Sequence, residues 1–294
     1  MALFHEEAAA PKSKPVEYHS SDFDFDEWAA ECLRDESLSM PSLSGGIVDD
    51  SKASETQSSS WNDFYGLVGR GTYQPRRYLT EEFKNYLELA QDADLRVIDI
   101  GCGHGSTAKV LINALGRSRI GRYIATDCSD TCLLLLNTFC ETNIGKDSVK
   151  IETAVWDITL SDWPSTPHNS SREPVIYNRA MCIFTLSAIP SEKHALCLAN
   201  IASSLGPGGY ILFRDYAKHD MTMYRHKIRL DEGLYQRADG TLAYYFDKEY
   251  MASLVDSIPN LRLVECEYCC VENKNRKTGQ ALRRVFIHAV IQVI

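Results

Sequence analysis

The sequence predicts an α/β fold built on a mainly parallel sheet with an antiparallel edge. From residue 95 onward, short apolar runs alternate with helical patterns, as they do in parallel α/β sheets. The first of these runs leads directly into a glycine-rich turn, and the last two follow each other like the strands of a hairpin. With 294 residues, of which 44% are hydrophobic, the chain can bury a substantial core.

The first predicted strand covers residues 95–100 and runs straight into a turn that contains Gly101, Gly103 and Gly105. A helical pattern follows, and glycines at such a junction let the backbone approach a ligand without hindrance from Cβ. The spacing G-x-G-x-G differs from the G-x-G-x-x-G with which dinucleotide-binding folds hold a pyrophosphate. Because Asp99 also lies two residues before the turn, a ligand without phosphate is favoured over a nicotinamide dinucleotide.

The next two predicted strands lead into carboxylates. Residues 123–127 form a strand that ends in Asp127, where a bidentate acceptor could hold the hydroxyls of a ribose. Residues 149–155 form a third strand, followed by Asp157 and Ile158, a position suited to an adenine amino group. Taken singly, each aspartate is slightly better explained as a helix cap. Together with the glycine turn they favour an adenosyl ligand, and S-adenosylmethionine fits, with its ammonium group near Asp99 and the turn carbonyls.

The remaining strands complete the sheet. Residues 174–180 and 210–214 predict strands four and five, separated by a helical stretch that ends in the breaker cluster at residues 205–209. Residues 261–271 and 283–294 predict a hairpin with a long loop. This hairpin supplies the antiparallel edge of the sheet.

Ten cysteines are scattered along the chain, mostly in apolar runs, and we expect reduced core thiols. Cys266 and Cys269 have the only C-x-x-C spacing. On a strand, residues three apart point to opposite faces, so these two sulfurs would not converge on one metal ion. We therefore predict no metal site.

The negative charge is concentrated in the first 60 residues. The net charge of the whole chain is −9, and residues 1–60 contain four basic and thirteen acidic side chains, so the remainder is formally neutral. We predict a largely disordered acidic arm over residues 1–60. Residues 23–33 could form a short docked helix, with Phe25, Trp28 and Leu33 on one face, but a solvated tail is favoured.

The location predicted from the sequence is inside the cell. No apolar stretch approaches the ~18 residues of a membrane-spanning helix. The first residues lack the basic and apolar regions of a secretory signal, and they are acidic where a mitochondrial transit peptide would be rich in arginine. The cytoplasm is therefore expected, with access to the nucleus left open.

With these residues in view, residues 61–294 resemble the class I S-adenosylmethionine-dependent methyltransferases, and more narrowly the methyltransferase-like enzymes that make 3-methylcytidine in transfer RNA. The motifs that carry the resemblance are Trp61-Asn-Asp-Phe-Tyr65, Arg76 with Thr80-Glu-Glu-Phe83, Asp99-Ile-Gly-Cys-Gly103, Ile183-Phe-Thr-Leu-Ser-Ala188, Leu212-Phe-Arg-Asp-Tyr216, Asp239-Gly-Thr241 with Tyr244 and Phe246, and Arg284-Val-Phe286. The resemblance implies a Rossmann-like, mainly parallel seven-stranded sheet with an antiparallel edge strand and helices on both faces. It also implies methyl transfer from S-adenosylmethionine to N3 of cytidine, at position 32 in the anticodon loop of tRNA.

The resemblance also assigns roles at matching positions. It implies that Trp61 and Tyr65 cover the cofactor, that Gly101 contacts it, that Asp127 holds the ribose, and that Asp157, Ile158 and Ile183 frame the adenine. From spacing alone, Trp61 and Tyr65 share one helix face, which is more often plain packing than a lid.

Three departures from the family pattern concern acceptor choice more than cofactor binding. Asn178 and Arg179 stand in the predicted fourth strand, where relatives usually carry acidic and apolar residues. Residues 72–74 lack the expected aromatic pair and lysine. Leu242 replaces a residue that is commonly basic.

Methyl transfer from a sulfonium to cytosine N3 is an in-line displacement that requires no strong base, so the protein mainly orients the reactants and places charge. Asp215, at the end of the fifth strand, is the candidate acceptor for the exocyclic amine of the base. Arg214 could orient Asp215 through a bidentate pair, and Tyr216 could stack on the base. A purely structural Arg214–Asp215 ion pair is an equally favoured alternative.

The N3 atom lies on the pairing edge, so the target base must be unpaired or flipped out, as in an RNA loop. Basic side chains interleaved with tyrosines, a composition that suits single-stranded nucleic acid, are expected around the active-site mouth. They are Arg70, Arg76, Arg77, Arg225, Lys227, Arg229, Arg237, Lys274, Arg276, Lys277, Arg283 and Arg284, with Tyr73, Tyr78, Tyr224, Tyr235, Tyr244 and Tyr245.

A neutral domain with an acidic arm should bind tRNA weakly alone, so we expect a helper protein such as an aminoacyl-tRNA synthetase, in line with the resemblance. Two alternatives stay open. One is a methyltransferase of the same fold that acts on a protein or a small molecule, since the fold alone does not name the acceptor. The other is a catalytically silent subunit that scaffolds a partner.

Overall fold

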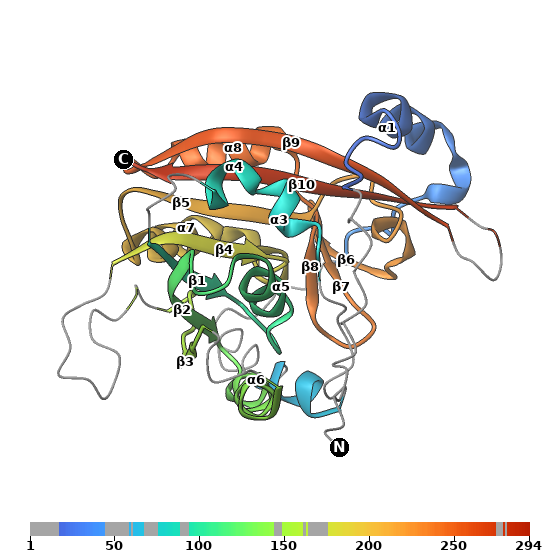
Figure 1. Ribbon diagram of the computed structural model, residues 1–294. Helices are drawn as coiled ribbons and strands as arrows, with labels where there is room; N and C mark the ends of the chain where they lie inside the picture. Colours follow the sequence, from blue (N-terminus) through green and yellow to red (C-terminus); the bar gives the residue numbers. More distant parts are fainter. Residues whose placement is uncertain are drawn as a thin grey trace, which may run out of the picture.

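A seven-stranded sheet forms the centre of the molecule (Figure 1). The structure, a computed structural model, describes residues 18–44, 59, 61–67, 76–88, 94–143, 149–160, 163, 176–274, 279 and 281–294. The strands are β1 (Leu95–Ile100), β2 (Ile120–Asp127), β3 (Ile151–Val155), β4 (Tyr177–Ile183), β5 (Leu205–Tyr216), β9 (Leu261–Lys274) and β10 (Ala281–Val293). Their order is β3-β2-β1-β4-β5-β10-β9; β1 to β5 are parallel, whereas β10 is antiparallel to both of its neighbours. The predicted fold class is confirmed.

Helices cover both faces of this sheet (Figure 1). The helices are α3 (Leu79–Glu82), α4 (Lys84–Leu87), α5 (Ser106–Leu115), α6 (Asp130–Asn143), α7 (His194–Ser203) and α8 (Lys248–Asp256). Successive strand residues point to opposite faces. Accordingly, Val97 of β1 packs in one apolar cluster with residues of α3 to α6, and its neighbour Ile98 packs in the other with residues of α7 and α8.

The fourth and fifth strands differ from their predicted bounds. β4 begins at Tyr177 and continues to Ile183. α7 ends at Ser203, so the glycine and proline cluster at residues 205–209 belongs to β5 rather than to the helix. The cluster interrupts the regular pairing between β4 and β5, and Gly208 has a positive φ of 78°. The cluster therefore does break regular structure, but it does so inside the strand.

A second, three-stranded sheet was not predicted. It consists of β6 (Ile228–Asp231), β7 (Leu234–Gln236) and β8 (Leu242–Tyr244), and antiparallel pairing joins them. Tyr235 and Tyr245 are almost completely buried in a small core beside it. Four short 3-10 helices complete the described elements: η1 (Glu36–Leu38), η3 (Leu186–Ala188), η4 (Ser191–Lys193) and η5 (Met223–Arg225).

Part of the acidic N-terminal segment is folded as a helix. α1 (Phe25–Arg34) is capped by the side chain of Asp24, which accepts from the Glu27 N–H. The indole of Trp28 is buried, donates to the His219 carbonyl at 2.8 Å and lies 4.7 Å from the Arg283 guanidinium. These contacts explain why the docked helix forms in place of the favoured solvated tail. Leu33, expected on the packed face, is 75% exposed.

The chain on either side of α1 ties two sheets together. Ser21 forms a parallel bridge with Cys270 of β9, and Leu43 forms one with Arg229 of β6. Residues 18–44, which we call the N-terminal strap, therefore span the distance from β9 to the small sheet. The extent of an acidic arm to residue 60 and the start of a separate domain at residue 61 remain predictions.

All ten cysteines are free thiols, and six of them belong to the two large apolar clusters as buried residues. They are Cys32, Cys102, Cys132, Cys182, Cys197 and Cys270. None of the helices in the described part of the chain has the length and apolar character needed to cross a membrane.

Candidate active site

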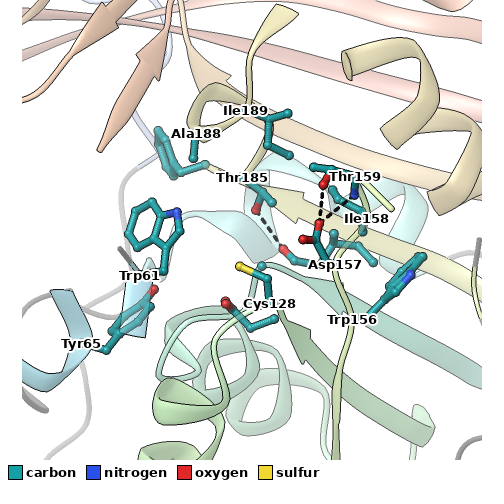
Figure 2. Close-up of a pocket in the computed structure, with 14 residues that line it drawn as sticks. Trp61, Tyr65, Cys128, Trp156, Asp157, Ile158, Thr159, Thr185, Ala188 and Ile189 are labelled. Carbon is teal, nitrogen blue, oxygen red and sulfur yellow. Dashed lines mark hydrogen bonds between the residues drawn. The ribbon is translucent and has the colours of Figure 1, made fainter. Parts of the chain in front are cut away.

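A cavity lies at the carboxyl ends of the parallel strands (Figure 2). We call it the first cavity. It is lined by residues at the ends of β1 to β4 and by the helical segment 61–67: Trp61, Tyr65, Ile100, Gly101, Asp127, Cys128, Trp156, Asp157, Ile158, Thr159, Phe184, Thr185, Ala188 and Ile189. The predicted cofactor residues that it brings together are Trp61, Tyr65, Gly101, Asp127, Asp157 and Ile158.

The glycine turn borders this cavity and a second one beside it, and residues larger than glycine do not fit at Gly101 and Gly103. Gly101 and Gly103 have φ values of 60° and 53°, in the left-handed region that glycine tolerates. A Cβ atom on Gly101 would lie 2.5 Å from Thr185 Cγ2, and one on Gly103 would lie 2.7 Å from the Tyr65 hydroxyl oxygen. The turn thus packs directly against two residues that line the cavity.

The two aspartates at the cavity stabilise the turns that follow their strands. Asp127 accepts from the backbone N–H groups of Gly103 at 3.0 Å and Ser129 at 2.9 Å. Burial raises the pKa of Asp127, although these backbone hydrogen bonds act in the opposite direction. Asp157 accepts from the N–H and hydroxyl of Thr159 at 2.9 and 2.7 Å.

The helix-cap interpretation of these two residues is wrong. α6 begins at Asp130, and its first turn is capped by Ser129, whose hydroxyl oxygen accepts from the Cys132 N–H at 3.3 Å. Asp157 precedes a turn rather than a helix. Both carboxylates remain at the cavity wall, where they can accept from the hydroxyls and the amine of an adenosine.

Asp99 is not among the residues that line either cavity, and its contact with the cofactor remains a prediction. Its side chain is almost fully buried and accepts from the Tyr123 hydroxyl at 2.8 Å. Burial raises the pKa of Asp99 to about 7. Asp99 therefore supports the turn from the core and makes no direct contribution to the cavity surface.

The aromatic pair on residues 61–67 lies where a lid is expected. The ring centroids of Trp61 and Tyr65 are 5.8 Å apart, and both rings lie on the same side of the first cavity (Figure 2). Asn62 on the same helical segment accepts from the Ser129 hydroxyl at 2.6 Å, which ties the segment to the turn after β2. The role of Trp61 and Tyr65 as a cofactor cover remains a prediction, which their position supports.

A second cavity adjoins the first. The two share Trp61, Tyr65, Gly101, Phe184 and Ala188, and the second adds Arg76, Cys102, Gly103, His104, Ser106, Ile183, Ser187, Tyr216, Arg237 and Leu242. Ile183 lines the second cavity and not the first, and its contact with adenine remains a prediction.

Aromatic rings and guanidinium groups are paired in the second cavity. The rings of Phe184 and Tyr216 are 5.0 Å apart. The Arg76 guanidinium lies 4.6 Å from the Phe184 ring, and that of Arg237 lies 5.3 Å from the Tyr216 ring. Flat apolar surfaces beside positive charges are suited to a nucleobase and its phosphates.

Arg214 and Asp215 do not form a pair, so both interpretations of that pair are wrong. Neighbouring strand residues point to opposite faces of the sheet. Asp215 is buried and accepts from the backbone N–H groups of Ser187 at 3.0 Å and Tyr216 at 2.9 Å, and burial raises its pKa to about 6. Arg214 instead pairs with Glu82 of α3 at 2.6 Å. Of the three predicted catalytic residues, Tyr216 alone lines a cavity.

Glu82 links Arg214 to a buried histidine whose charge should affect stability. His288 Nδ1 lies 3.0 Å from Glu82, and Nε2 lies 3.2 Å from Glu265. Burial alone would lower the pKa of His288, but hydrogen bonding and the charges of Glu82 and Glu265 outweigh burial and raise it. A raised pKa means that the stabilisation is complete below about pH 6.5 and is lost as the pH rises through the pKa of the folded state.

We therefore expect the free energy of unfolding to decrease from pH 6 to pH 9, and to decrease less in His288→Gln. Urea unfolding at both pH values measures the difference. His226→Gln is the control, because burial lowers the pKa of that histidine. An identical decrease in the wild type and in His288→Gln would contradict the assignment.

Only some of the predicted basic residues reach the cavities. Arg76 and Arg237 line the second cavity. Arg283 pairs with Glu31 of α1, and Arg284 pairs with the buried Asp220. Residues named in the prediction that lie outside the described part of the chain are Arg70, Tyr73, Arg276 and Lys277.

The unusual residues of the fourth strand lie at its opposite end, away from the cavities. The Asn178 side chain accepts from the Arg96 N–H and donates to the Asp94 carbonyl. Arg179 donates to the Tyr86 carbonyl at 2.6 Å. These substitutions therefore serve the fold and do not alter the cavity walls.

Several cavity residues were missed by sequence reasoning. Cys128, Trp156 and Thr185 follow strands directly, and their position in the chain was the available signal. Phe184 has a positive φ of 57°, which no residue pattern indicated.

Comparison with known proteins defines the class. Residues 72–258 match the family described as "Methyltransferase domain". The fold is similar to an S-adenosylmethionine-dependent methyltransferase from Anabaena variabilis ATCC 29413, with a TM-score of 0.57 and 14% identity over 88% of this chain and 99% of that one. A second such enzyme, from Methanosarcina mazei, has a TM-score of 0.50 and 18% identity over 72% of this chain and 96% of that one. Fold and site together define a class I S-adenosylmethionine-dependent methyltransferase.

Sequence relatives identify the family to which the chain belongs within this class. The tRNA N(3)-cytidine methyltransferase METTL6 of Rattus norvegicus is 30% identical over 78% of this chain and 77% of its own length. The tRNA N(3)-methylcytidine methyltransferase Mettl2 of Drosophila melanogaster is 29% identical over 77% and 68%. The tRNA(Thr) (cytosine(32)-N(3))-methyltransferase of Saccharomyces cerevisiae is 28% identical over 79% and 36%. The chain belongs to the family of tRNA N(3)-cytidine methyltransferases.

Proposed function

We propose that the protein transfers a methyl group from S-adenosylmethionine to N3 of cytidine 32 in the anticodon loop of a tRNA. The relatives named for this reaction support the acceptor, and one of them is named for position 32. The structural observation that carries the proposal is the pair of adjoining cavities. A nucleoside cofactor fits the first, and the second offers aromatic rings and arginines on the other side of a shared wall.

The chemistry of the residues that line the first cavity supports S-adenosylmethionine as its ligand. Asp127 is placed to accept from the ribose hydroxyls and Asp157 from the adenine amine, while Ile158 offers an apolar contact to the ring. Trp61 and Tyr65 line both cavities, which supports their role as a cover. S-adenosylmethionine supplies an electrophilic methyl group on a positively charged sulfur.

The residues of the second cavity orient the acceptor base. Phe184 and Tyr216 stack against it, and Arg76 and Arg237 hold the flanking phosphates. Asp215 acts as a positioning residue, because both of its oxygens accept from backbone N–H groups, one of them from Ser187 in the cavity wall. The chain thereby contributes orientation and charge placement, which suffice for an in-line displacement.

The test is methylation of a tRNA transcript with labelled S-adenosylmethionine, followed by mass spectrometry of the nucleosides. The expected product is 3-methylcytidine, and a transcript with uridine at position 32 is the matched control. Label that survives ribonuclease treatment in a protein or a metabolite would contradict an RNA acceptor. Saturable cofactor binding with no turnover on any tRNA would indicate a catalytically silent subunit.

The helper protein belongs to this proposal. The region after residue 60 is formally neutral, so its attraction to a polyanion is limited. The methylation assay is therefore run with and without the aminoacyl-tRNA synthetase that is cognate to the transcript, and the synthetase is expected to increase the rate.

We also propose a cytoplasmic location, which fluorescence microscopy of the tagged full chain would test.

Arg237→Ala should weaken tRNA binding and reduce the slope of log affinity against log salt by about 1, because one phosphate contact is lost. Filter binding at several salt concentrations measures both quantities. Arg117→Ala, an exposed arginine beyond the far end of α5, is the matched control and should leave the slope unchanged. A salt-independent affinity in the wild type would point to a small-molecule acceptor.

A further inference from the structure

Residues 184–189 form the wall between the two cavities, and their backbone has to be held in place. Phe184 and Ala188 line both cavities, Thr185 and Ile189 line the first, and Ser187 lines the second. The positive φ of Phe184, 57°, is unfavourable for a residue other than glycine and persists only where the surroundings enforce it. We call residues 184–189 the wall segment.

A buried histidine holds one side of this wall segment. His194 is the first residue of α7 and is fully buried. Its Nε2 atom lies 3.0 Å from the Leu186 carbonyl oxygen and 2.9 Å from the Ile189 carbonyl oxygen. Carbonyl oxygens only accept hydrogen bonds, so Nε2 carries the hydrogen and donates to both.

The other ring nitrogen determines how His194 is itself oriented. Burial lowers the pKa of His194 to about 4, so the ring is neutral at pH 7 and Nδ1 carries a lone pair. The Tyr250 hydroxyl, on α8, lies 2.9 Å from Nδ1 and therefore donates to it. The Phe246 ring stacks on the imidazole at a centroid distance of 5.2 Å. The imidazole thus has a fixed tautomer and a fixed plane.

The opposite side of the wall segment is held by Asp215. Its carboxylate accepts from the Ser187 N–H at 3.0 Å, within the same turn whose carbonyls His194 binds. Asp215 belongs to β5 and His194 belongs to α7, so two different elements hold the wall segment. Between them they fix the turn that separates the two cavities.

We propose that His194 is a positioning residue for methyl transfer, because its Nε2–H holds the Leu186 and Ile189 carbonyls and thereby fixes the wall segment, which borders both the cofactor cavity and the acceptor cavity. This inference rests on the proposed function. A displacement of about 1 Å in reacting groups can cost on the order of 100-fold in rate. The wall segment is therefore a place where a residue outside both cavities can control the chemical step.

The test compares His194→Leu, which has no donor, with His194→Gln, whose amide can still donate to a carbonyl. In His194→Leu, kcat for tRNA methylation should fall about 100-fold while KM for tRNA stays within about threefold. His194→Gln should recover about tenfold of that loss, the equivalent of one hydrogen bond. Equal kcat losses in the two variants, or a kcat within twofold of the wild type in a folded His194→Leu, would overturn the proposal.

Two further measurements test the proposal if His194→Leu does not fold or if activity alone is ambiguous. If His194→Leu fails to fold, Tyr250→Phe retains the imidazole but removes its orienting donor; a lower kcat supports the proposal and an unchanged kcat overturns it. Hydrogen exchange of the peptide that covers residues 184–189 does not depend on the substrate. It should be about tenfold faster in His194→Leu than in His194→Gln. Absence of methylation by the wild type would contradict the proposed function, whereas unchanged exchange would contradict the role of His194.

Discussion

Asp127→Ala is expected to raise the dissociation constant for S-adenosylmethionine about 100-fold, which corresponds to about 3 kcal/mol. Of the two acidic residues that line the first cavity in the described part of the chain, Asp127 is the one proposed to hold the ribose, and hydrogen bonds to a charged acceptor contribute roughly 1.5–3 kcal/mol each. The substitution also removes the acceptor for the Gly103 N–H and so loosens the glycine turn. Isothermal titration calorimetry measures the change.

The matched control for this prediction is Asp130→Ala. Asp130 lies three residues further along the chain, in the first turn of α6, and is exposed. Its removal should change the dissociation constant less than about twofold, since exposed charges interact weakly. An unchanged affinity in Asp127→Ala would show that the ribose is held elsewhere, and the assignment of the first cavity would fail.

Gly101→Ala should likewise lower S-adenosylmethionine affinity by at least about 30-fold, through backbone strain and overpacking of about 2 kcal/mol. The new Cβ would lie 2.5 Å from Thr185 Cγ2 and 2.6 Å from Thr185 Oγ1. Thr185 cannot simply rotate away, because its hydroxyl donates to the Ile100 carbonyl at 2.9 Å. Calorimetry gives the affinity, and thermal unfolding gives the accompanying loss of stability.

Gly116→Ala separates the effect of backbone conformation from that of space. Gly116 has a φ of 62°, close to that of Gly101, but a Cβ there meets no atom within 4 Å. The Gly116→Ala variant should be less stable than the wild type but retain its affinity for S-adenosylmethionine. Thr185→Ala combined with Gly101→Ala should recover part of the affinity, and equal affinities in the single and double variants would show that the contact with Thr185 is not the cause.

The adenosyl half of the site was predictable because its residues occupy strand ends. Hydrophobic runs locate β1, β2 and β3, and the residue after such a run must lie at the same edge of a parallel sheet. Gly101, Asp127 and Asp157 were predicted in this way and line the first cavity, while their contacts with the cofactor remain predictions. The glycine turn is also marked by composition, since few other residues tolerate its conformation.

The acceptor half was harder to predict because its contacts join residues far apart in the chain. Arg214 and Asp215 are adjacent in sequence, yet the pleat of β5 sends one to Glu82 and the other to Ser187. Strands of three residues, such as β7 and β8, are too short to show a period. The docking of Trp28 depends on a carbonyl of residue 219, which no local pattern reveals.

The N-terminal strap has a consequence for how copies of the protein behave in solution. β9 is an edge strand of the large sheet, and the free backbone groups of an exposed edge are a template for intermolecular β-pairing and aggregation. The strap occupies part of this edge: the Asp22 N–H donates to the Cys270 carbonyl, the Cys270 N–H donates to the Ser20 carbonyl, and the Asp22 carboxylate accepts from the Glu272 N–H. We therefore expect the strap to hinder pairing between the β9 strands of two copies of the protein. It occupies part of the edge, and its acidic side chains repel those of a second copy.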